Sequence, residues 1–319
     1  MTEVNDPPPD RAQGAPQPTA PAGSRTGAAL DSMPPELLVL VGAMSVQCGA
    51  GLAVTLLREY GPLPVAMLRI VFGALLLIAF QPLRLRRAER AALISCVALG
   101  LILAAMNTLF YVAVSRIPLG VAVTIEFSGP LAVAVLGSRR LLDLAWVALA
   151  AAGIYILAGG RLVADDAVGI AAVFGAAVCW ALYIVTGRRM AQYWPDGRGL
   201  TLAMIVASAV VVPVALGLSD VKPLLAAPLA VAGGLAVALF SSAIPYTAEI
   251  AALRRLPAAT FGVLMSLEPA IAAAVGFLLL GQVLRLSDLA AIVCVALASA
   301  GASVSARRLP VAAGELEAA

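Results

Sequence analysis

The sequence contains no histidine, and only 12% of its 319 residues are Asp, Glu, Lys or Arg. The lack of histidine excludes Ser-His-Asp and Cys-His catalytic arrangements, an imidazole general base and any His-ligated metal. The low share of charge excludes a soluble protein, because a soluble chain of this length must cover its surface with charged side chains. Hydrophobic residues make up 62% of the chain and its mean hydropathy is +0.99, which indicates an integral membrane protein.

Cysteine is also scarce, and its four occurrences do not cluster. Each lies alone in an apolar run: Cys48, Cys96, Cys179 and Cys294. Structural disulfides and zinc sites need neighbouring cysteines outside the lipid, so we interpret these four as packing residues. The basic residues fall in separate short loops, which does not favour nucleic-acid binding. We therefore expect no metal, no other cofactor and no nucleic-acid partner, and the sequence predicts no oligomeric state.

Composition divides the chain into two tails and a long apolar region. Residues 1–34 are rich in proline and poor in large apolar side chains, which predicts a disordered cytoplasmic tail, and residues 306–319 form a second, short cytoplasmic tail. Between them, apolar runs recur at close to the ~20 residues that a helix needs to cross a bilayer. Isolated strands cannot satisfy their backbone in lipid, so we predict an all-α protein. Its ten transmembrane helices are expected over residues 36–57, 63–80, 91–114, 118–137, 142–160, 168–187, 199–218, 228–250, 257–280 and 286–305.

The basic residues predict the orientation of these helices. If the amino terminus is cytoplasmic, fifteen basic residues lie in cytoplasmic segments and five in external ones, while Arg69 lies within the second span. Loops rich in Lys and Arg remain on the cytoplasmic side of a membrane. Both termini are therefore predicted to be cytoplasmic.

The two halves of the apolar region resemble each other. A shift of 139 residues places residues 116–118 (Arg-Ile-Pro) on residues 255–257 (Arg-Leu-Pro). We predict two five-helix repeats, over residues 35–160 and 168–305. An odd number of spans in each repeat makes the second enter the membrane from the opposite side. Inverted repeats of this kind typically enclose a substrate site near the midplane and work by alternating access, which favours a transporter over a membrane enzyme.

Charged side chains inside the spans are the first candidates for function, because each costs about 2.5–3.5 kcal/mol to insert. Glu126 and Glu268 are expected near mid-bilayer, in the fourth and ninth spans. They either bind substrate or protons, or hold two helices together as structural carboxylates. Arg69 either faces a cavity, where it can bind a substrate carboxylate, or extends toward the outer surface.

Three further groups of residues complete the candidate site. Polar or aromatic side chains inside spans are candidate substrate contacts, with helix packing as the alternative: Gln47, Asn107, Trp180, Tyr183 and Tyr246. Prolines inside spans remove a helical hydrogen bond and are candidate hinges, with a simple kink as the alternative: Pro130, Pro245 and Pro269. Charges at the cytoplasmic end of the eighth span are either functional or form a helix-end salt bridge: Glu249, Arg254 and Arg255.

Three segments resemble the EamA family of the drug/metabolite transporter superfamily, and within it the exporters of threonine and homoserine. They are residues 245–249 (PYTAE), 252–270 (ALRRLPAATFGVLMSLEPA) and 126–131 (EFSGPL), and the resemblance covers about residues 36–305. Gln282 is a departure, since relatives often have Glu after the ninth span; we expect it to affect a helix end. The resemblance implies a multi-pass exporter of amino acids or related small metabolites in the bacterial cytoplasmic membrane.

Such an exporter would be driven by the proton gradient or by the outward gradient of its substrate. Because the chain has no histidine, proton coupling would fall on Glu126 or Glu268. The alternatives are an uncoupled facilitator, an exporter of other amines or metabolites, and a membrane-embedded enzyme. An enzyme would need a clustered catalytic set, and the one adjacent acidic pair, Asp165-Asp166, is expected in a solvated outer loop.

Overall fold

The computed structural model describes residues 33–80, 89–136, 141–157, 166–194, 198–245, 248, 252, 255–256, 261 and 264–306. Within this part of the chain every regular element is a helix, as predicted. Five helical stretches are long and apolar enough to cross a membrane: Pro35–Tyr60, Pro62–Ala79, Arg90–Val114, Ala167–Gly187 and Arg198–Leu218. Five shorter apolar helices accompany them: Leu119–Val133, Ala145–Ile156, Pro228–Ala243, Glu268–Leu280 and Leu286–Gly301.

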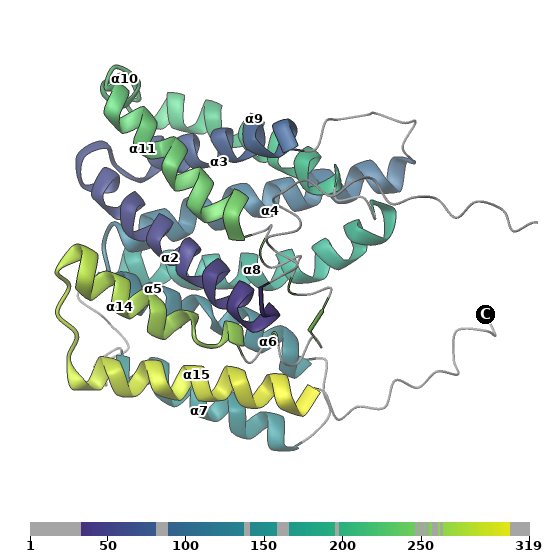
Figure 1. Ribbon diagram of the computed structural model, residues 1–319, viewed down its shortest axis with the longest axis vertical. Helices are drawn as coiled ribbons and strands as arrows, with labels where there is room; N and C mark the ends of the chain where they lie inside the picture. The colour runs from purple at the N-terminus through teal and green to yellow at the C-terminus, as the bar shows by residue number, and fades with distance from the viewer. Residues whose placement is uncertain are drawn as a thin grey trace, which may run out of the picture.

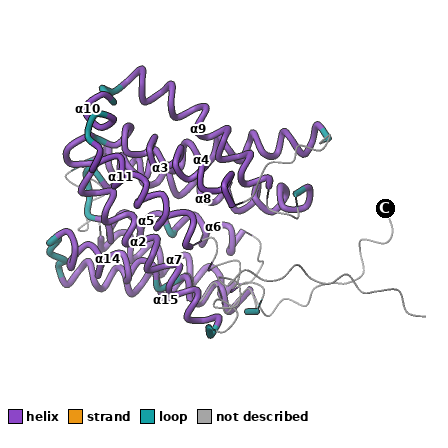
Figure 2. Tube along the Cα trace, turned by 45° about the horizontal axis from the view of Figure 1, so that its top comes forward, coloured by secondary structure: helices purple, strands orange, loops and turns teal. Residues whose placement is uncertain are grey.

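The helices run side by side in one bundle (Figures 1 and 2). The first half contains α2 (Pro35–Tyr60), α3 (Pro62–Phe80), α4 (Arg90–Val114), α5 (Leu119–Glu126), α6 (Ser128–Leu136) and α7 (Leu141–Leu157). The second half contains α8 (Ala167–Tyr193), α9 (Arg198–Leu218), α10 (Lys222–Leu225), α11 (Pro228–Ala238), the π-helix η1 (Leu239–Ala243), α14 (Glu268–Leu280) and α15 (Leu286–Ala306).

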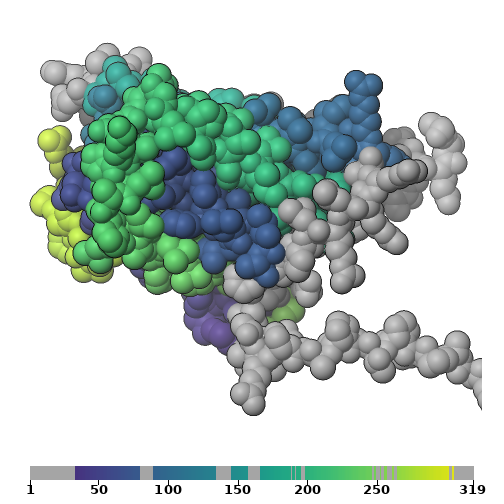
Figure 3. All heavy atoms as spheres, turned by 90° about the horizontal axis from the view of Figure 1, so that it is seen from above, coloured from purple at the N-terminus to yellow at the C-terminus, as the bar shows by residue number. Residues whose placement is uncertain are grey.

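The two halves are interleaved rather than stacked as separate lobes. Figure 3 shows the surfaces of α9 and α11 against those of α3 and α4, and these helices pack on one another in the pairs α3 with α9, α4 with α9 and α11 with α3. Their contact is apolar, with buried residues such as Ile70, Leu99 and Ala207. A second apolar cluster, which includes Val54, Leu119 and Val173, joins α2, α5 and α8. Close van der Waals packing of these side chains between helices from both halves holds the bundle together.

Three predicted spans are interrupted in the structure. The fourth consists of α5 and α6, separated by a turn at Phe127, and the eighth passes from α11 into η1. In the ninth, α14 begins only at Glu268, after a turn at Ser266 and Leu267. Each of these three predicted spans therefore departs from a regular α-helix, close to a candidate hinge proline.

Prolines account for two of the interruptions. Pro130 is the third residue of α6, and its missing N–H is the one that would have bonded the Glu126 carbonyl, so the helix breaks between them. Pro269 lies in the first turn of α14. The N–H groups of a first turn have no partner within the helix, so a proline there costs no helical hydrogen bond. The expected kink at Pro269 is thus a helix start. Pro245 follows η1 after one residue.

Gly129 allows α6 and α8 to approach closely. A Cβ atom at this position would collide with the Ala177 carbonyl oxygen, which belongs to the backbone of α8 and cannot rotate away. We expect Gly129→Ala to destabilise the protein by about 1–3 kcal/mol through overpacking, measured as a lower midpoint of thermal unfolding in detergent. Gly217, in α9, has open space where its Cβ would be, so Gly217→Ala is the matched control and should leave the midpoint unchanged or higher. Equal midpoints for the two variants would contradict this packing.

Candidate functional site

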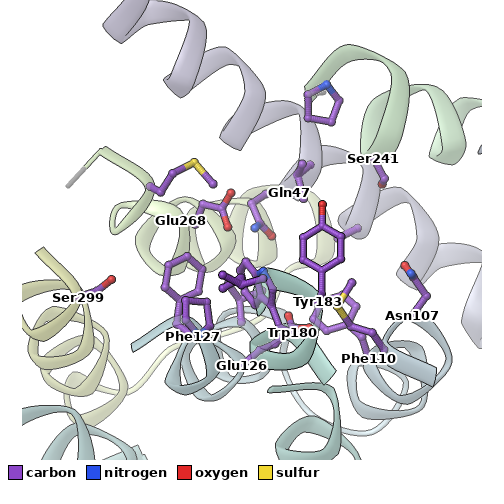
Figure 4. A pocket seen from close by; sticks show the side chains of 18 of the residues that line it. Gln47, Asn107, Phe110, Glu126, Phe127, Trp180, Tyr183, Ser241, Glu268 and Ser299 are labelled. Atoms are coloured by element: carbon purple, nitrogen blue, oxygen red, sulfur yellow. The ribbon is translucent and has the colours of Figure 1, made fainter. Parts of the chain in front are cut away.

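A cavity of about 390 Å³ lies within the bundle. Its wall is made by helices of both halves, namely α2, α3, α4, α5, α6, α8, η1, α14 and α15. Every predicted substrate- or proton-binding residue that the structure describes lines this cavity: Gln47, Arg69, Asn107, Glu126, Trp180, Tyr183 and Glu268 (Figure 4). Pro130 and Pro245 line it as well. Residues chosen from seven separate predicted spans therefore meet in one place.

The other predicted residues lie elsewhere. Tyr246, Glu249 and Arg254 are outside the described residues. Pro269 is buried and is not among the lining residues. Arg255 is exposed, and its Nη1 donates a hydrogen bond of 2.7 Å to the Met33 carbonyl oxygen, so it ties the segment after the eighth span to the start of α2.

Both cavity carboxylates lie where a helix is broken. Glu126 is the last residue of α5 and is 8% exposed, and Glu268 is the first residue of α14 and is 4% exposed. The free N–H groups and the dipole at the start of a helix favour negative charge, which suits Glu268 at the start of α14. Glu126 lies between the carboxyl end of α5 and the start of α6, where the two helix dipoles oppose each other. Broken helices that point their amino ends into a cavity are a common way of building an ion or substrate site in transporters.

Arg69 faces the interior of the bundle and not the outer surface. Its guanidinium carbon lies 5.4 Å from the centroid of the Tyr111 ring, a cation–π distance, and its charge acts on Glu126. Tyr111 is fully buried in α4 and holds Arg69 toward the cavity. Sequence reasoning missed this residue, although it lies one helical turn after the candidate Asn107 and so on the same face of the helix.

Aromatic side chains form another part of the cavity wall. Phe127 meets Trp180 edge to face, with 5.0 Å between ring centroids and 85° between the rings. Tyr183 follows Trp180 by three residues on α8, so both rings lie on one face of that helix. The amide nitrogen of Asn107 donates to the Leu103 carbonyl of its own helix at 2.8 Å. The wall thus combines aromatic faces with a small set of polar groups.

Two polar atoms of the cavity wall have no hydrogen-bond partner within the described structure. They are Oε1 of Gln47, a residue that is 2% exposed, and Oγ of Ser241, a residue that is 5% exposed. Ser241 belongs to the π-helix η1. The carbonyl oxygen of its neighbour Phe240 accepts a 2.7 Å hydrogen bond from the Ser45 hydroxyl of α2. Sequence reasoning did not select Ser241; the signal was a pair of serines within an apolar run just before Pro245.

Of the acidic pair Asp165-Asp166, only Asp166 lies within the described residues, and its contacts are structural. Asp166 caps α8 by accepting a 2.8 Å hydrogen bond from the Gly169 N–H, and it forms a 2.9 Å ion pair with Arg116. These two contacts, with the Gly169 N–H first, lower the pKa of Asp166. Asp166 therefore has a structural role and is not simply solvated. Gln282 also serves a helix end, as predicted, because its Oε1 accepts a 3.1 Å hydrogen bond from the Leu119 N–H at the start of α5.

Comparison with known proteins agrees with this architecture. The model of the EamA-like transporter family matches residues 167–304. The threonine/homoserine exporter RhtA of Salmonella typhimurium LT2 is 41% identical over 287 residues, which cover 86% of this chain and 93% of that protein. RhtA of Escherichia coli K12 is 40% identical over 285 residues, covering 86% and 92%. A solved crystal structure with 18% identity covers 85% of this chain and 98% of its own with a TM-score of 0.59, which shows a shared fold.

Proposed function

Since the chain belongs to the EamA-like transporter family, and is a transporter and not an enzyme, we propose that it exports threonine, homoserine and related small amino acids across the bacterial inner membrane. The substrate class follows from its relatives, which are named as threonine/homoserine exporters. The observation that carries the proposal to this chain is the cavity, where a permanent cation and two carboxylates line one buried space.

These groups match the chemistry of an amino-acid zwitterion. Arg69 can hold the substrate carboxylate with two parallel N–H donors. Glu126 or Glu268 can bind the ammonium, with the faces of Trp180 and Tyr183 as further cation sites. A cavity of about 390 Å³ has room for one small amino acid together with water.

The same carboxylates supply a route to proton coupling. The chain has no histidine, and among the described residues the carboxyl groups of the cavity wall are those of Glu126 and Glu268. A proton and a substrate ammonium therefore compete for the same oxygens. If binding of the substrate releases the proton and binding of the proton releases the substrate, each substrate molecule that leaves the cell is exchanged for a proton that enters it. This exchange is antiport by alternating access.

We further propose ten spans in two inverted repeats with both termini in the cytoplasm. Helix packing supports a two-fold relation between the halves, in which α2 is equivalent to α8, α4 to α11, and α5 with α6 to α14. The contact of α2 with α11 then corresponds to that of α8 with α4. The contact of α2 with α14 corresponds to that of α8 with α5 and α6. Three further packed pairs, α3 with α9, α5 with α14 and α7 with α15, each join a helix to its equivalent in the other half, as expected for helices on a two-fold axis. The start of α2 and the end of α15 also lie at the same end of the bundle (Figure 1).

Transport itself is tested with inside-out membrane vesicles, whose lumen corresponds to the cell exterior. We expect saturable uptake of labelled threonine that unlabelled homoserine inhibits, in vesicles that contain the protein and not in vesicles without it. Uptake of neither amino acid would contradict the substrate assignment. The family and the fold do not depend on this result.

A further inference from the structure

We propose that Gln47 recognises the side-chain hydroxyl of the transported amino acid and is a specificity-determining residue of the cavity. This inference rests on the proposed export of hydroxy amino acids. It assigns one polar group of the wall to the part of the substrate that distinguishes threonine and homoserine from apolar amino acids.

Gln47 carries, in the wall of the cavity, a buried hydrogen-bonding atom without a partner among the described residues. Its side chain is almost fully buried on α2, it lines the cavity, and its Oε1 has no partner in the described part of the chain. Leaving a buried amide oxygen unpaired costs free energy, so the oxygen gains when a ligand donates to it. An amide also suits a hydroxyl, because it can accept through Oε1 and donate through Nε2.

The position of Gln47 relative to the charged groups favours the hydroxyl over the two charged ends of the substrate. Gln47 and Glu268 project into the cavity from α2 and α14, two helices that pack against each other (Figure 4). In threonine the hydroxyl carbon is bonded to the carbon that bears the ammonium. A substrate whose ammonium binds Glu268 therefore presents its hydroxyl on the side of Gln47, while the carboxylate is left for Arg69.

The other buried hydroxyls without a partner in the described part of the chain do not share this position. Tyr111 carries one of them, beside Arg69, but it does not line the cavity. Ser241 lies against Gly49, and residues 47 and 49 project from nearly opposite faces of α2, because two residues turn an α-helix by about 200°. Thr201 is fully buried and does not line the cavity. Gln47 is thus the unpaired group beside a cavity carboxylate.

The physical consequence is selection against apolar isosteres. Valine has the shape of threonine, and norvaline that of homoserine, with a methyl group in place of the hydroxyl. Either isostere would cover the Gln47 oxygen without donating to it, and a site built to hydrogen-bond a hydroxyl rejects such analogues. We expect the unmodified protein to prefer threonine over valine by about tenfold or more in kcat/KM, the scale of one buried hydrogen bond.

Counterflow in proteoliposomes of the purified protein tests this with threonine, valine, homoserine and norvaline. In Gln47→Met, an apolar side chain of similar shape, the threonine-to-valine ratio of kcat/KM should fall about tenfold through a higher KM for threonine, while the KM for valine stays the same. Gln47→Glu keeps acceptor oxygens and should keep the preference. Thr201→Val removes a buried unpaired hydroxyl outside the cavity and is the matched control, with an unchanged ratio.

The outcomes separate this inference from the proposed function. It is overturned if Gln47→Met keeps the preference, if it weakens threonine and valine equally, or if Gln47→Glu loses the preference as fully as Gln47→Met. An unmodified protein that moves threonine and valine equally well would also overturn it. If the unmodified protein moves none of the four amino acids, the proposed function itself fails. Should Gln47→Met not yield folded protein, Gln47→Leu takes its place under the same criteria.

Discussion

Replacing Glu126 and Glu268 together by glutamine is expected to abolish the response of transport to a pH gradient. Glutamine has the same shape as glutamate and can accept a hydrogen bond from the substrate ammonium, but it cannot take up a proton at neutral pH. Exchange of labelled for unlabelled threonine should therefore continue with a raised KM, whereas uptake driven by an imposed gradient should fall to the level seen without one.

The measurement compares both activities in the same proteoliposomes. Glu36 and Glu89 are exposed residues at the ends of α2 and α4, so the double variant Glu36→Gln/Glu89→Gln is the matched control and should keep the response to the gradient. Gradient-driven uptake that survives in the Glu126→Gln/Glu268→Gln protein would show that the coupled proton is carried elsewhere.

Replacing Arg69 by glutamine is expected to raise the KM for threonine about a hundredfold, because the substrate carboxylate would lose a charged partner inside a buried site. Arg69→Lys keeps the charge but loses the planar pair of donors, so its KM for threonine should lie between that of the unmodified protein and that of Arg69→Gln. Arg58→Gln, at the exposed end of α2, is the control and should change nothing.

Threonine amide separates contact from an indirect effect of Arg69. It has no carboxylate, so its transport should be weak in the unmodified protein and no weaker in Arg69→Gln. If Arg69→Gln reduced transport of threonine and threonine amide by the same factor, Arg69 would act by holding Glu126 or the helices in place. If neither substrate were affected, the proposed carboxylate contact would be wrong.

The sequence was sufficient to locate the charged part of the site. Glu126, Glu268 and Arg69 were selected because a charge inside an apolar span is costly unless it lines a cavity, and all three do line one. The direction of Arg69 was left open, since a residue near a helix end can extend to the surface or turn inward. Its orientation depends on Tyr111, a contact between α3 and α4 that a single sequence does not specify.

Backbone detail was less predictable than residue choice. The described parts of the apolar runs are helical, as predicted. Hydropathy does not report where a run is broken, so it did not indicate the turn at Phe127, the π-helix η1 or the start of α14 at Glu268. The three prolines marked these places, yet a proline is compatible with a kink, a break or a helix start. Ser241 became a cavity residue only through the π-helical turn.

Steady-state accumulation of labelled threonine in inside-out vesicles tests the central claim, that the cavity couples amino-acid export to protons. With the lumen made acidic, we predict that threonine accumulates above its concentration in the medium and that a protonophore releases the excess. Vesicles without the protein should show neither effect. Equal concentrations on both sides of the membrane, with or without the gradient, would contradict the account and identify an uncoupled facilitator.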